Sequence, residues 1–137
     1  METQPLYKCI DCIRLYVPDL EAGMDFYCNR LGLNAIWKTD TAIGLGMGEG
    51  DREIVIQNES GGQEIDIKVD SVMEAAEQIK AAGGQILSGS FDIKIGKCAV
   101  VRDPWDNQYI ILDTTKGIFV TDDDGNIIGQ KPLQLNT

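Results

Sequence analysis

Residues 10–20 read Ile-Asp-Cys-Ile-Arg-Leu-Tyr-Val-Pro-Asp-Leu, and this stretch decides the fold. As far as Val17, apolar and polar residues alternate, which is the two-residue period of a strand with one buried face. Pro18 and Asp19 then end the strand and open a helix, with Asp19 as the predicted N-cap. The sequence therefore predicts a strand that runs directly into a helix.

The predicted helix carries one apolar stripe and has a clear end. Its apolar residues recur at helical spacing: Leu20, Met24, Tyr27 and Leu31. Gly32 stands in the position where glycine commonly ends a helix. We expect the stripe to pack on the apolar side of the strand, which consists of Ile13, Leu15 and Val17.

The same pattern returns 52 residues further along the chain. A second alternating strand is followed by helix-start residues, a helical stripe and a glycine end. Its residues are Ile65, Ile67 and Val69, then Asp70 and Ser71, then Val72, Ala76 and Ile79, and finally Gly84, which matches Gly32. Period, cap and end all repeat, so the chain is predicted to contain one unit twice.

Three short strands are predicted after each helix, separated by turns rich in Gly, Asp and Glu. The predicted strands cover residues 34–38, 41–46 and 53–57 in the first unit, and 85–88, about 93–101 and 108–112 in the second. Residues 118–121 and 127–128 flank an Asp-Gly turn and predict a C-terminal β-hairpin. The fold class is therefore α+β, with two tandem βαβββ modules and a hairpin.

The length fits a single domain, residues 1–137. We expect a first module over residues 8–59, a second over 63–115, and a tail over 116–137.

Composition excludes several functions. The net charge of −10 opposes binding to nucleic acid, because such binding depends largely on Lys and Arg. No apolar run is long enough to span a membrane, and the N-terminus lacks signal-peptide features, so a cytoplasmic location is expected. Cys9 and Cys12 form a C-x-x-C, but the chain has no second pair and no histidine, so a zinc site is not expected.

The polar positions of both alternating strands point away from the helices. They are Cys12, Arg14 and Tyr16 in the first unit, and Glu64, Asp66 and Lys68 in the second. These residues line a ligand cavity if the sheets curl around one, and form a solvated face if they do not. The pattern alone leaves both alternatives open.

Several stretches together resemble the vicinal oxygen chelate superfamily, which includes glyoxalases, extradiol dioxygenases and bleomycin-resistance proteins. They are residues 10–27, Arg-Leu-Gly-Leu at 30–33, Val-Asp-Ser-Val at 69–72, Ala-Ala-Gly-Gly at 81–84, and Val-Val-Arg-Asp-Pro-Trp-Asp-Asn at 100–107. The resemblance covers residues 8 to about 115. It implies curled mixed sheets around a ligand cavity, and formation of a homodimer.

In metal-using members, four positions hold a metal that polarises oxygen atoms of the substrate. Carried over by motif, these positions are Cys12, Gln57, Glu64 and Ile110. An isoleucine cannot ligate, and a thiol, an amide and one carboxylate do not make a glyoxalase or iron-oxygenase donor set. No cofactor is therefore expected, although a weak divalent site through Cys12 and Glu64 stays open.

Three functions remain. The first is a metal-independent binder of a small molecule, with a degenerate metal site, contacted by Cys12, Arg14, Tyr16, Gln57, Asp66, Lys68 and Ile110. The second is an enzyme of lyase or dioxygenase type acting on a small oxygenated metabolite, with Glu64 as the general base. A side-chain-filled accessory domain is a third reading. Trp37 could face either side of its sheet, and Trp105 is expected to plug the structure at its turn.

Overall fold

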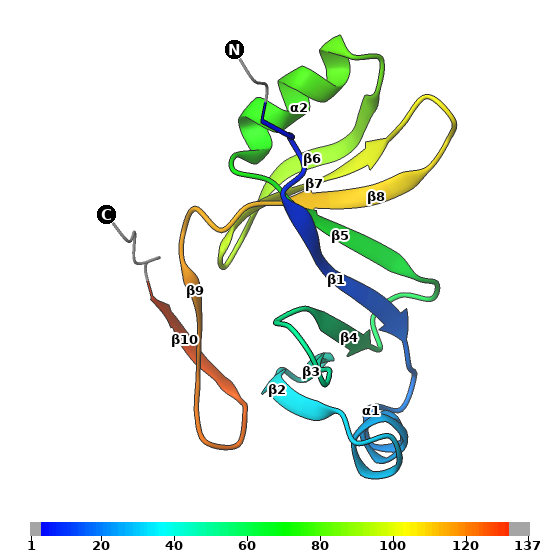
Figure 1. The fold of residues 1–137 in the computed structure, drawn as a ribbon, viewed down its shortest axis with the longest axis vertical. Helices are drawn as coiled ribbons and strands as arrows, with labels where there is room; N and C mark the ends of the chain where they lie inside the picture. The colour runs from blue at the N-terminus through cyan, green and yellow to red at the C-terminus, as the bar shows by residue number, and fades with distance from the viewer. Residues whose placement is uncertain (1–3, 132–137) are drawn as a thin grey trace. The chain divides into compact units, whose positions relative to one another are not determined.

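The computed structural model describes the backbone of residues 4–131 and divides the chain into two compact units. Unit 1 contains residues 4–10, 66–119 and 130–131, and unit 2 contains residues 11–65 and 120–129. No helix within residues 4–131 is long and apolar enough to cross a membrane. The structure is of the α+β class, with the strands forming mixed sheets (Figure 1).

Unit 2 holds the first strand–helix stretch and the three strands that follow. The elements are β1 (Cys9–Tyr16), α1 (Leu20–Met24), the π-helix η1 (Asp25–Arg30), β2 (Asn34–Lys38), β3 (Ala42–Gly46) and β4 (Glu53–Gln57). The strands lie in the order β2-β3-β4-β1. β1 and β4 are parallel, whereas the other neighbouring strands are antiparallel.

Unit 1 repeats this order of elements, with the single α-helix α2 in place of α1 and η1. It comprises β5 (Glu64–Lys68) from Asp66 onward, α2 (Val72–Ala81), β6 (Gln85–Ile93), β7 (Gly96–Arg102) and β8 (Gln108–Leu112), with the strands in the order β5-β8-β7-β6. β5 and β8 are parallel, and α2 packs against β6 and β7 (Figure 1). β6 extends beyond the predicted residues 85–88 because it forms a long hairpin with β7.

Both helices start at the predicted caps. The carboxylate of Asp19 accepts hydrogen bonds from the backbone N–H groups of Glu21 and Ala22. The hydroxyl of Ser71 accepts one from the N–H of Glu74. Each cap satisfies N–H groups that have no partner inside the helix, which fixes where the helix begins.

The first helix differs from the second by a π turn. The N–H of Leu31 donates to the carbonyl of Phe26, five residues back, at 3.1 Å. Gly32, at φ +82°, follows the cap Asp19 by 13 positions, whereas Gly83, at φ +107°, follows Ser71 by 12. The left-handed glycine that matches Gly32 is therefore Gly83 and not Gly84, as the sequence repeat suggested.

This π turn also changes the buried stripe of the first helix. Tyr27 and Cys28 pack on the core, but Leu31 is 56% exposed, so its predicted place in the stripe is wrong. A π turn contains more residues than an α turn, and the residue four positions after Tyr27 consequently no longer lies on the same face.

Each unit has its own apolar core between helix and sheet. In unit 2 the buried residues Ile43, Leu45 and Ile56 pack against partly buried Val17 and residues of the first helix. The expected contact of Ile13 is wrong, because this side chain is 40% exposed. An eight-residue strand spans roughly 26 Å and an 11-residue helix only about 16 Å, so the helix cannot cover the whole strand.

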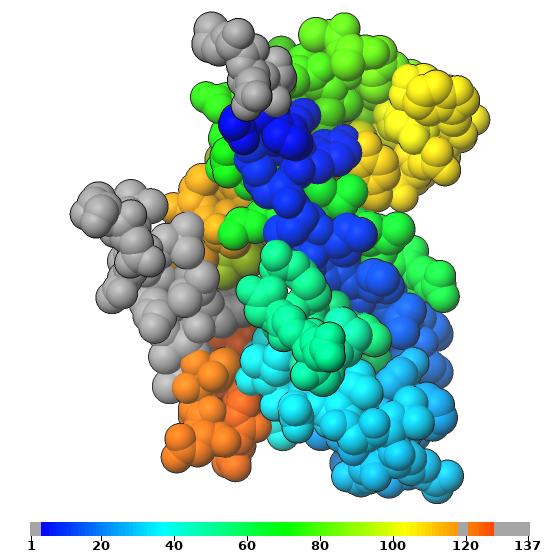
Figure 2. Space-filling model, in the orientation of Figure 1, coloured from blue at the N-terminus to red at the C-terminus, as the bar shows by residue number. Residues whose placement is uncertain are grey.

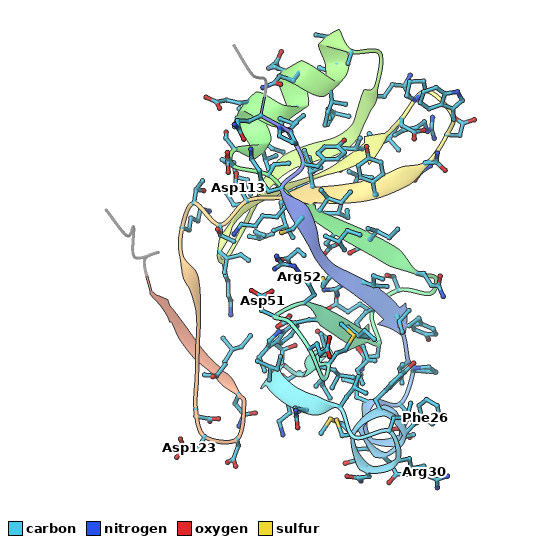
Figure 3. The ribbon with its side chains drawn as sticks, in the orientation of Figure 1. Phe26, Arg30, Asp51, Arg52, Asp113 and Asp123 are labelled. Atoms are coloured by element: carbon cyan, nitrogen blue, oxygen red, sulfur yellow. The ribbon has the colours of Figure 1, made fainter. Side chains whose placement is uncertain are left out.

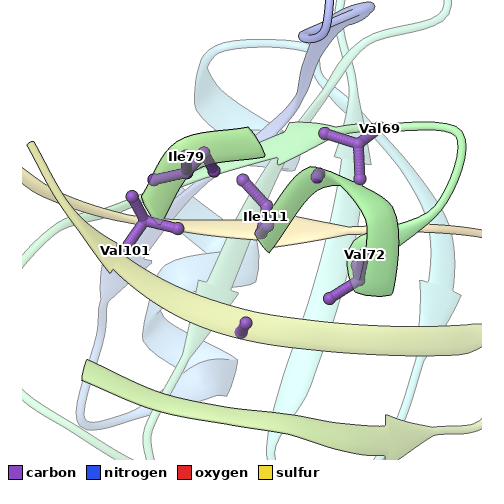
Figure 4. Packing of buried hydrophobic residues seen from close by; sticks show 7 residues of the cluster. Val69, Val72, Ile79, Val101 and Ile111 are labelled. Atoms are coloured by element: carbon purple, nitrogen blue, oxygen red, sulfur yellow. The ribbon is translucent and has the colours of Figure 1, made fainter. Parts of the chain in front are cut away.

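In unit 1 the core is formed by α2 on the sheet (Figure 4). Its buried residues are Val69, Val72, Ala75, Ile79, Ala99, Val101 and Ile111. The buried carboxylate of Asp113 fixes the start of α2 by accepting the N–H of Val72 at 2.8 Å, and it accepts the N–H of Lys97 at 2.9 Å (Figure 3).

The C-terminal strands β9 (Ile118–Thr121) and β10 (Ile127–Lys131) pair in a two-stranded sheet. Their turn is held by Asp122, whose carboxylate accepts the N–H groups of Asp124 and Asn126. The turn contacts β2, since the N–H of Lys38 donates to the carbonyl of Gly125 at 2.6 Å. In unit 2 the tail therefore has a backbone partner.

Candidate functional site

The register of β1 and β4 defines one polar face of unit 2. Because the strands are parallel and alternate side chains share a face, three pairs of residues lie on the side opposite the helix. The pairs are Cys12 with Glu53, Arg14 with Val55, and Tyr16 with Gln57. We call this surface the β1/β4 face.

Cys12 is the first of the predicted site residues and is buried on the β1/β4 face. It forms an apolar cluster with Ala42 and Val55, against which Trp37 packs. The Cys12 side chain therefore packs within an apolar cluster, with Glu53 as its register neighbour on β4.

Arg14 and Glu64 form an ion pair, with 3.4 Å between Nε of Arg14 and Oε2 of Glu64. The side chains are 25% and 40% exposed, so the pair lies at the boundary with solvent and contributes at most about 1 kcal/mol to folding. The two charges balance each other. Glu64, the predicted general base, therefore lies next to the guanidinium of Arg14.

Tyr16 and Gln57 have different surroundings. Tyr16 is 45% exposed and offers an aromatic surface. Gln57 is buried and holds the turn after β4: its amide oxygen accepts the N–H groups of Glu59 and Ser60, and its amide nitrogen donates to the carbonyl of Ser60 at 2.7 Å. The Gln57 amide therefore stabilises the turn.

The other three predicted residues lie in unit 1. Asp66 is buried and is the register partner of Ile110, and Lys68 is the register partner of Leu112. Asp66 and Ile110 therefore lie side by side on the sheet face away from α2, while Ile111 points into the core under α2.

The sequence reasoning missed the interaction between Trp37 and Glu53. The indole Nε1 of Trp37 lies 3.0 Å from both carboxylate oxygens of Glu53. The indole crosses β3 at Gly44, where an added Cβ would lie 2.0 Å from Nε1. A glycine at this position is therefore required for Trp37 to reach β4.

The environment of Glu53 disfavours its charge. Burial raises the pKa of Glu53, the hydrogen bond from Trp37 acts to lower it, and the nearby charge of Asp11 acts to raise it, so that the pKa lies above its usual value. Glu53 takes part in no ion pair with the Lys and Arg side chains that the structure describes. A carboxyl group with a raised pKa thus lies beside Cys12, its register partner on β1.

Trp105 does not plug the structure, contrary to expectation. It is 79% exposed, in the protruding turn of residues 103–107, which Figure 2 shows in yellow. The turn is held instead by Asp103, whose carboxylate accepts the N–H groups of Trp105 and Asn107. Asp106 adopts φ +69°, in the left-handed region that favours glycine.

The four positions that hold the metal in metal-using relatives do not form a donor set here. Cys12 packs in an apolar cluster, Glu64 is paired with Arg14, the Gln57 amide is engaged by the turn, and Ile110 has no donor atom. Among the described residues, no three Cys, Asp or Glu side chains come together as a metal site. These positions do not fit the metal-dependent chemistry of the resemblance.

The fold and residue pattern agree with a family model. Residues 9–129 match the Glyoxalase/Bleomycin resistance protein/Dioxygenase superfamily, and the chain belongs to this superfamily. No match to a curated protein was found.

Solved structures share the fold at low sequence identity. Methylmalonyl-CoA epimerase from Mycobacterium tuberculosis is 12% identical, with a TM-score of 0.68, over 82% of this chain and 92% of that one. The Mn(II)-bound glyoxalase from Novosphingobium aromaticivorans is 20% identical (TM-score 0.59), over 77% of this chain and 37% of that one. An extradiol ring-cleaving dioxygenase from B. fuscum is also 20% identical (TM-score 0.58), over 80% of this chain and 33% of that one.

Proposed function

We propose that the protein binds a small molecule on the β1/β4 face without the help of a metal ion. The observation that carries this proposal is what the side chains at the four donor positions contact. The amide of Gln57 holds a turn, and Cys12 packs in an apolar cluster. Ile110 is aliphatic, and the charge of Glu64 is neutralised by Arg14. Polar and aromatic groups nevertheless remain on the same face, including half-exposed Tyr16 and the indole of Trp37.

A ligand on this face would meet groups of complementary kinds. The phenol of Tyr16 and the indole of Trp37 supply flat apolar surface that loses little conformational freedom on binding. Arg14 supplies donors at the edge of the face, and Glu53 supplies acceptors. Few directed polar groups within apolar surface are the usual composition of a small-molecule site.

The alternative is an enzyme with a weak divalent site through Cys12 and Glu64. In its favour, the Novosphingobium aromaticivorans neighbour is a glyoxalase that binds Mn(II). Against it, a metal ion between these residues would have to displace Arg14 from Glu64. It would also have to coordinate the thiol of Cys12, which lies in an apolar cluster. Both changes oppose metal binding, and we therefore rank this alternative second.

The test combines metal analysis with ligand binding on the full chain. Reduced protein is analysed for Mn, Fe, Co, Ni, Cu and Zn, and a library of small metabolites is screened by thermal shift with and without EDTA. We expect metal well below one equivalent, and ligands whose thermal shift persists in EDTA and is lost in Arg14→Ala or Tyr16→Ala. The exposed variant Glu21→Gln, on the first helix, is the control and should retain the shift.

Two results would overturn the proposal. Stoichiometric metal that disappears in Cys12→Ala or Glu64→Ala would establish the metal-dependent alternative. Ligand shifts that persist in both Arg14→Ala and Tyr16→Ala would place the binding site elsewhere on the molecule.

A further inference from the structure

The β1/β4 face carries the carboxylate of Glu53, and its Arg14 contacts the carboxylate of Glu64 on β5. The two carboxylates differ in their electrostatic surroundings. Glu64 has the guanidinium of Arg14 at 3.4 Å. Glu53 has an indole N–H as its hydrogen-bond donor and forms no ion pair with the described Lys and Arg side chains. One of the two negative charges is thus balanced within the protein, and the other is not.

An unbalanced carboxylate in this position is costly for the folded protein. Half-buried carboxylates are normally compensated by a cation or by several hydrogen bonds. Here a single N–H is shared between both oxygens of Glu53, and Asp11 adds a second negative charge nearby. With a net charge of −10, the rest of the chain adds further negative potential.

Trp37 supplies the second half of a recognition site. Its indole lies across Gly44 on β3, and the residue is only partly buried. The electron-rich face of an indole attracts cations, and among the aromatic side chains it does so most strongly. The carboxylate and the indole are held together at 3.0 Å, so that both can contact one ligand.

We infer that Glu53 and Trp37 together recognise a ligand that carries an ammonium or similar organic cation next to an apolar group. This inference rests on the proposed function, since it names the chemical class of the ligand for the β1/β4 face. The cation replaces the counter-charge that Glu53 lacks, and the adjoining apolar group covers the indole and the Cys12 cluster. An anionic ligand is disfavoured, because the only cation described on this face, Arg14, is already paired.

The chain offers a direct reporter for this test. It contains two tryptophans, Trp37 and Trp105, so an amide NMR spectrum shows two indole N–H signals, and Trp105→Phe assigns the one from Trp37. Three probes of nearly equal shape are compared at pH 7.5 and low salt: benzylammonium, benzyl alcohol and benzoate. Because the three probes have nearly the same shape, differences in their binding report on charge.

We expect the Trp37 signal to shift and saturate with benzylammonium, with an affinity at least about tenfold higher than for benzyl alcohol or benzoate, which corresponds to roughly 1.4 kcal/mol. The preference should fall as salt is raised, because the charges are partly exposed. Glu53→Gln keeps an acceptor for the indole N–H and should abolish the preference, whereas the exposed Glu49→Gln should leave it intact.

The outcomes separate this inference from the proposed function. A neutral or anionic probe that binds as tightly as benzylammonium, or a preference that survives in Glu53→Gln, overturns the cation assignment while metabolite binding in EDTA still stands. No response of Trp37 to any probe also overturns it. A dispersed NMR spectrum of Glu53→Gln verifies that the variant is folded, so a lost preference cannot be attributed to unfolding.

Discussion

Trp37 reaches across β3 to Glu53, and its indole nitrogen lies 3.0 Å from both oxygens of that carboxylate. The contact joins β2 to β4 over a strand that has no side chain at Gly44. It positions an acid and an aromatic ring on the same face as Arg14 and Tyr16.

Replacing Glu53 by Gln should stabilise the protein at neutral pH. The pKa of folded Glu53 is raised above the unfolded value of about 4.3, so the protonated form favours folding. That stabilisation is complete below about pH 4.3 and is lost as the pH rises through the folded pKa. At pH 7.5 the neutral amide should raise Tm by roughly 1–3 °C, and near pH 4 the difference should vanish.

Thermal unfolding of wild type, Glu53→Gln and Glu49→Gln across pH 4–8 measures this effect. Glu49 is an exposed acid near the same strand, and its variant should follow the wild type at every pH. A Glu53→Gln protein that is less stable than the wild type at pH 7.5 would show that the carboxylate charge is stabilising here.

Gly44→Ala should displace the indole of Trp37. The added Cβ would lie 2.0 Å from Nε1, closer than any real contact, and Trp37 would have to leave its place over β3. We expect a red shift of Trp37 fluorescence in a Trp105→Phe background and a loss of about 1–3 kcal/mol of stability. Gly48→Ala is the matched control, because no atom lies within 4 Å of its Cβ position. Unchanged emission of Gly44→Ala would contradict the packing.

Gln57→Ala should loosen the turn after β4. Its amide makes three hydrogen bonds to the backbone of Glu59 and Ser60, and loss of a buried set of this kind costs roughly 2 kcal/mol. Hydrogen exchange should accelerate at the amides of Glu59 and Ser60. Asn58→Ala alters an exposed neighbour and should leave their exchange slow. If exchange is equal in the two variants, the amide does not hold this turn.

Asp113→Asn should weaken unit 1 and its resistance to acid. Burial acts to raise the pKa of Asp113, but the N–H groups of Val72 and Lys97, with Thr115, more than offset it, and the pKa lies below the usual value. The charged form therefore stabilises the fold above about pH 3.9, and this contribution is lost as the pH falls through the folded pKa. In Asp113→Asn the side-chain NH₂ faces one of these backbone N–H donors, which leaves that donor without an acceptor. This costs roughly 2 kcal/mol or more of stability.

Denaturant unfolding between pH 3 and pH 7 tests this prediction. The wild type should lose its advantage over Asp113→Asn as the pH approaches 3. Asp123→Asn, at an exposed position of the β9–β10 turn, should cost under about 0.5 kcal/mol (Figure 3). An Asp113→Asn protein with wild-type stability at pH 7 would exclude the structural role of this carboxylate.

Much of the fold could be read from local pattern. Asp19 and Ser71 cap their helices as predicted, and the strands at 34–38, 53–57 and 108–112 have the predicted bounds. These features depend on near neighbours in the chain. The exposure of Ile13 and Leu31 could not be read in this way. That of Ile13 depends on how much of the strand the helix covers, and that of Leu31 on a π turn that leaves no sequence signal.

The candidate site was less predictable. A bulge between Ala35 and Trp37 shifts the register of β2 against β3, so counting alternate residues could not assign a face to Trp37. Gln57 was predicted as a site residue from its spacing in the sequence. Its amide bonds instead to the turn after β4, and the geometry of that turn could not be read from the spacing. Glu53 lies four residues before Gln57 on the same strand and therefore on the same face. Together with Gly44, which lies opposite Trp37 in the β2–β3 pairing, this position was the signal available in the sequence.

The π turn in Asp25–Arg30 lets the first helix be longer than the second. The first helix holds one more residue between its cap and its left-handed glycine than the second, yet the strand after it begins two residues beyond that glycine in both cases. A helix can accommodate one extra residue as a π bulge, so the strands on either side keep their places. Deleting one codon here should therefore regularise the helix without moving any strand.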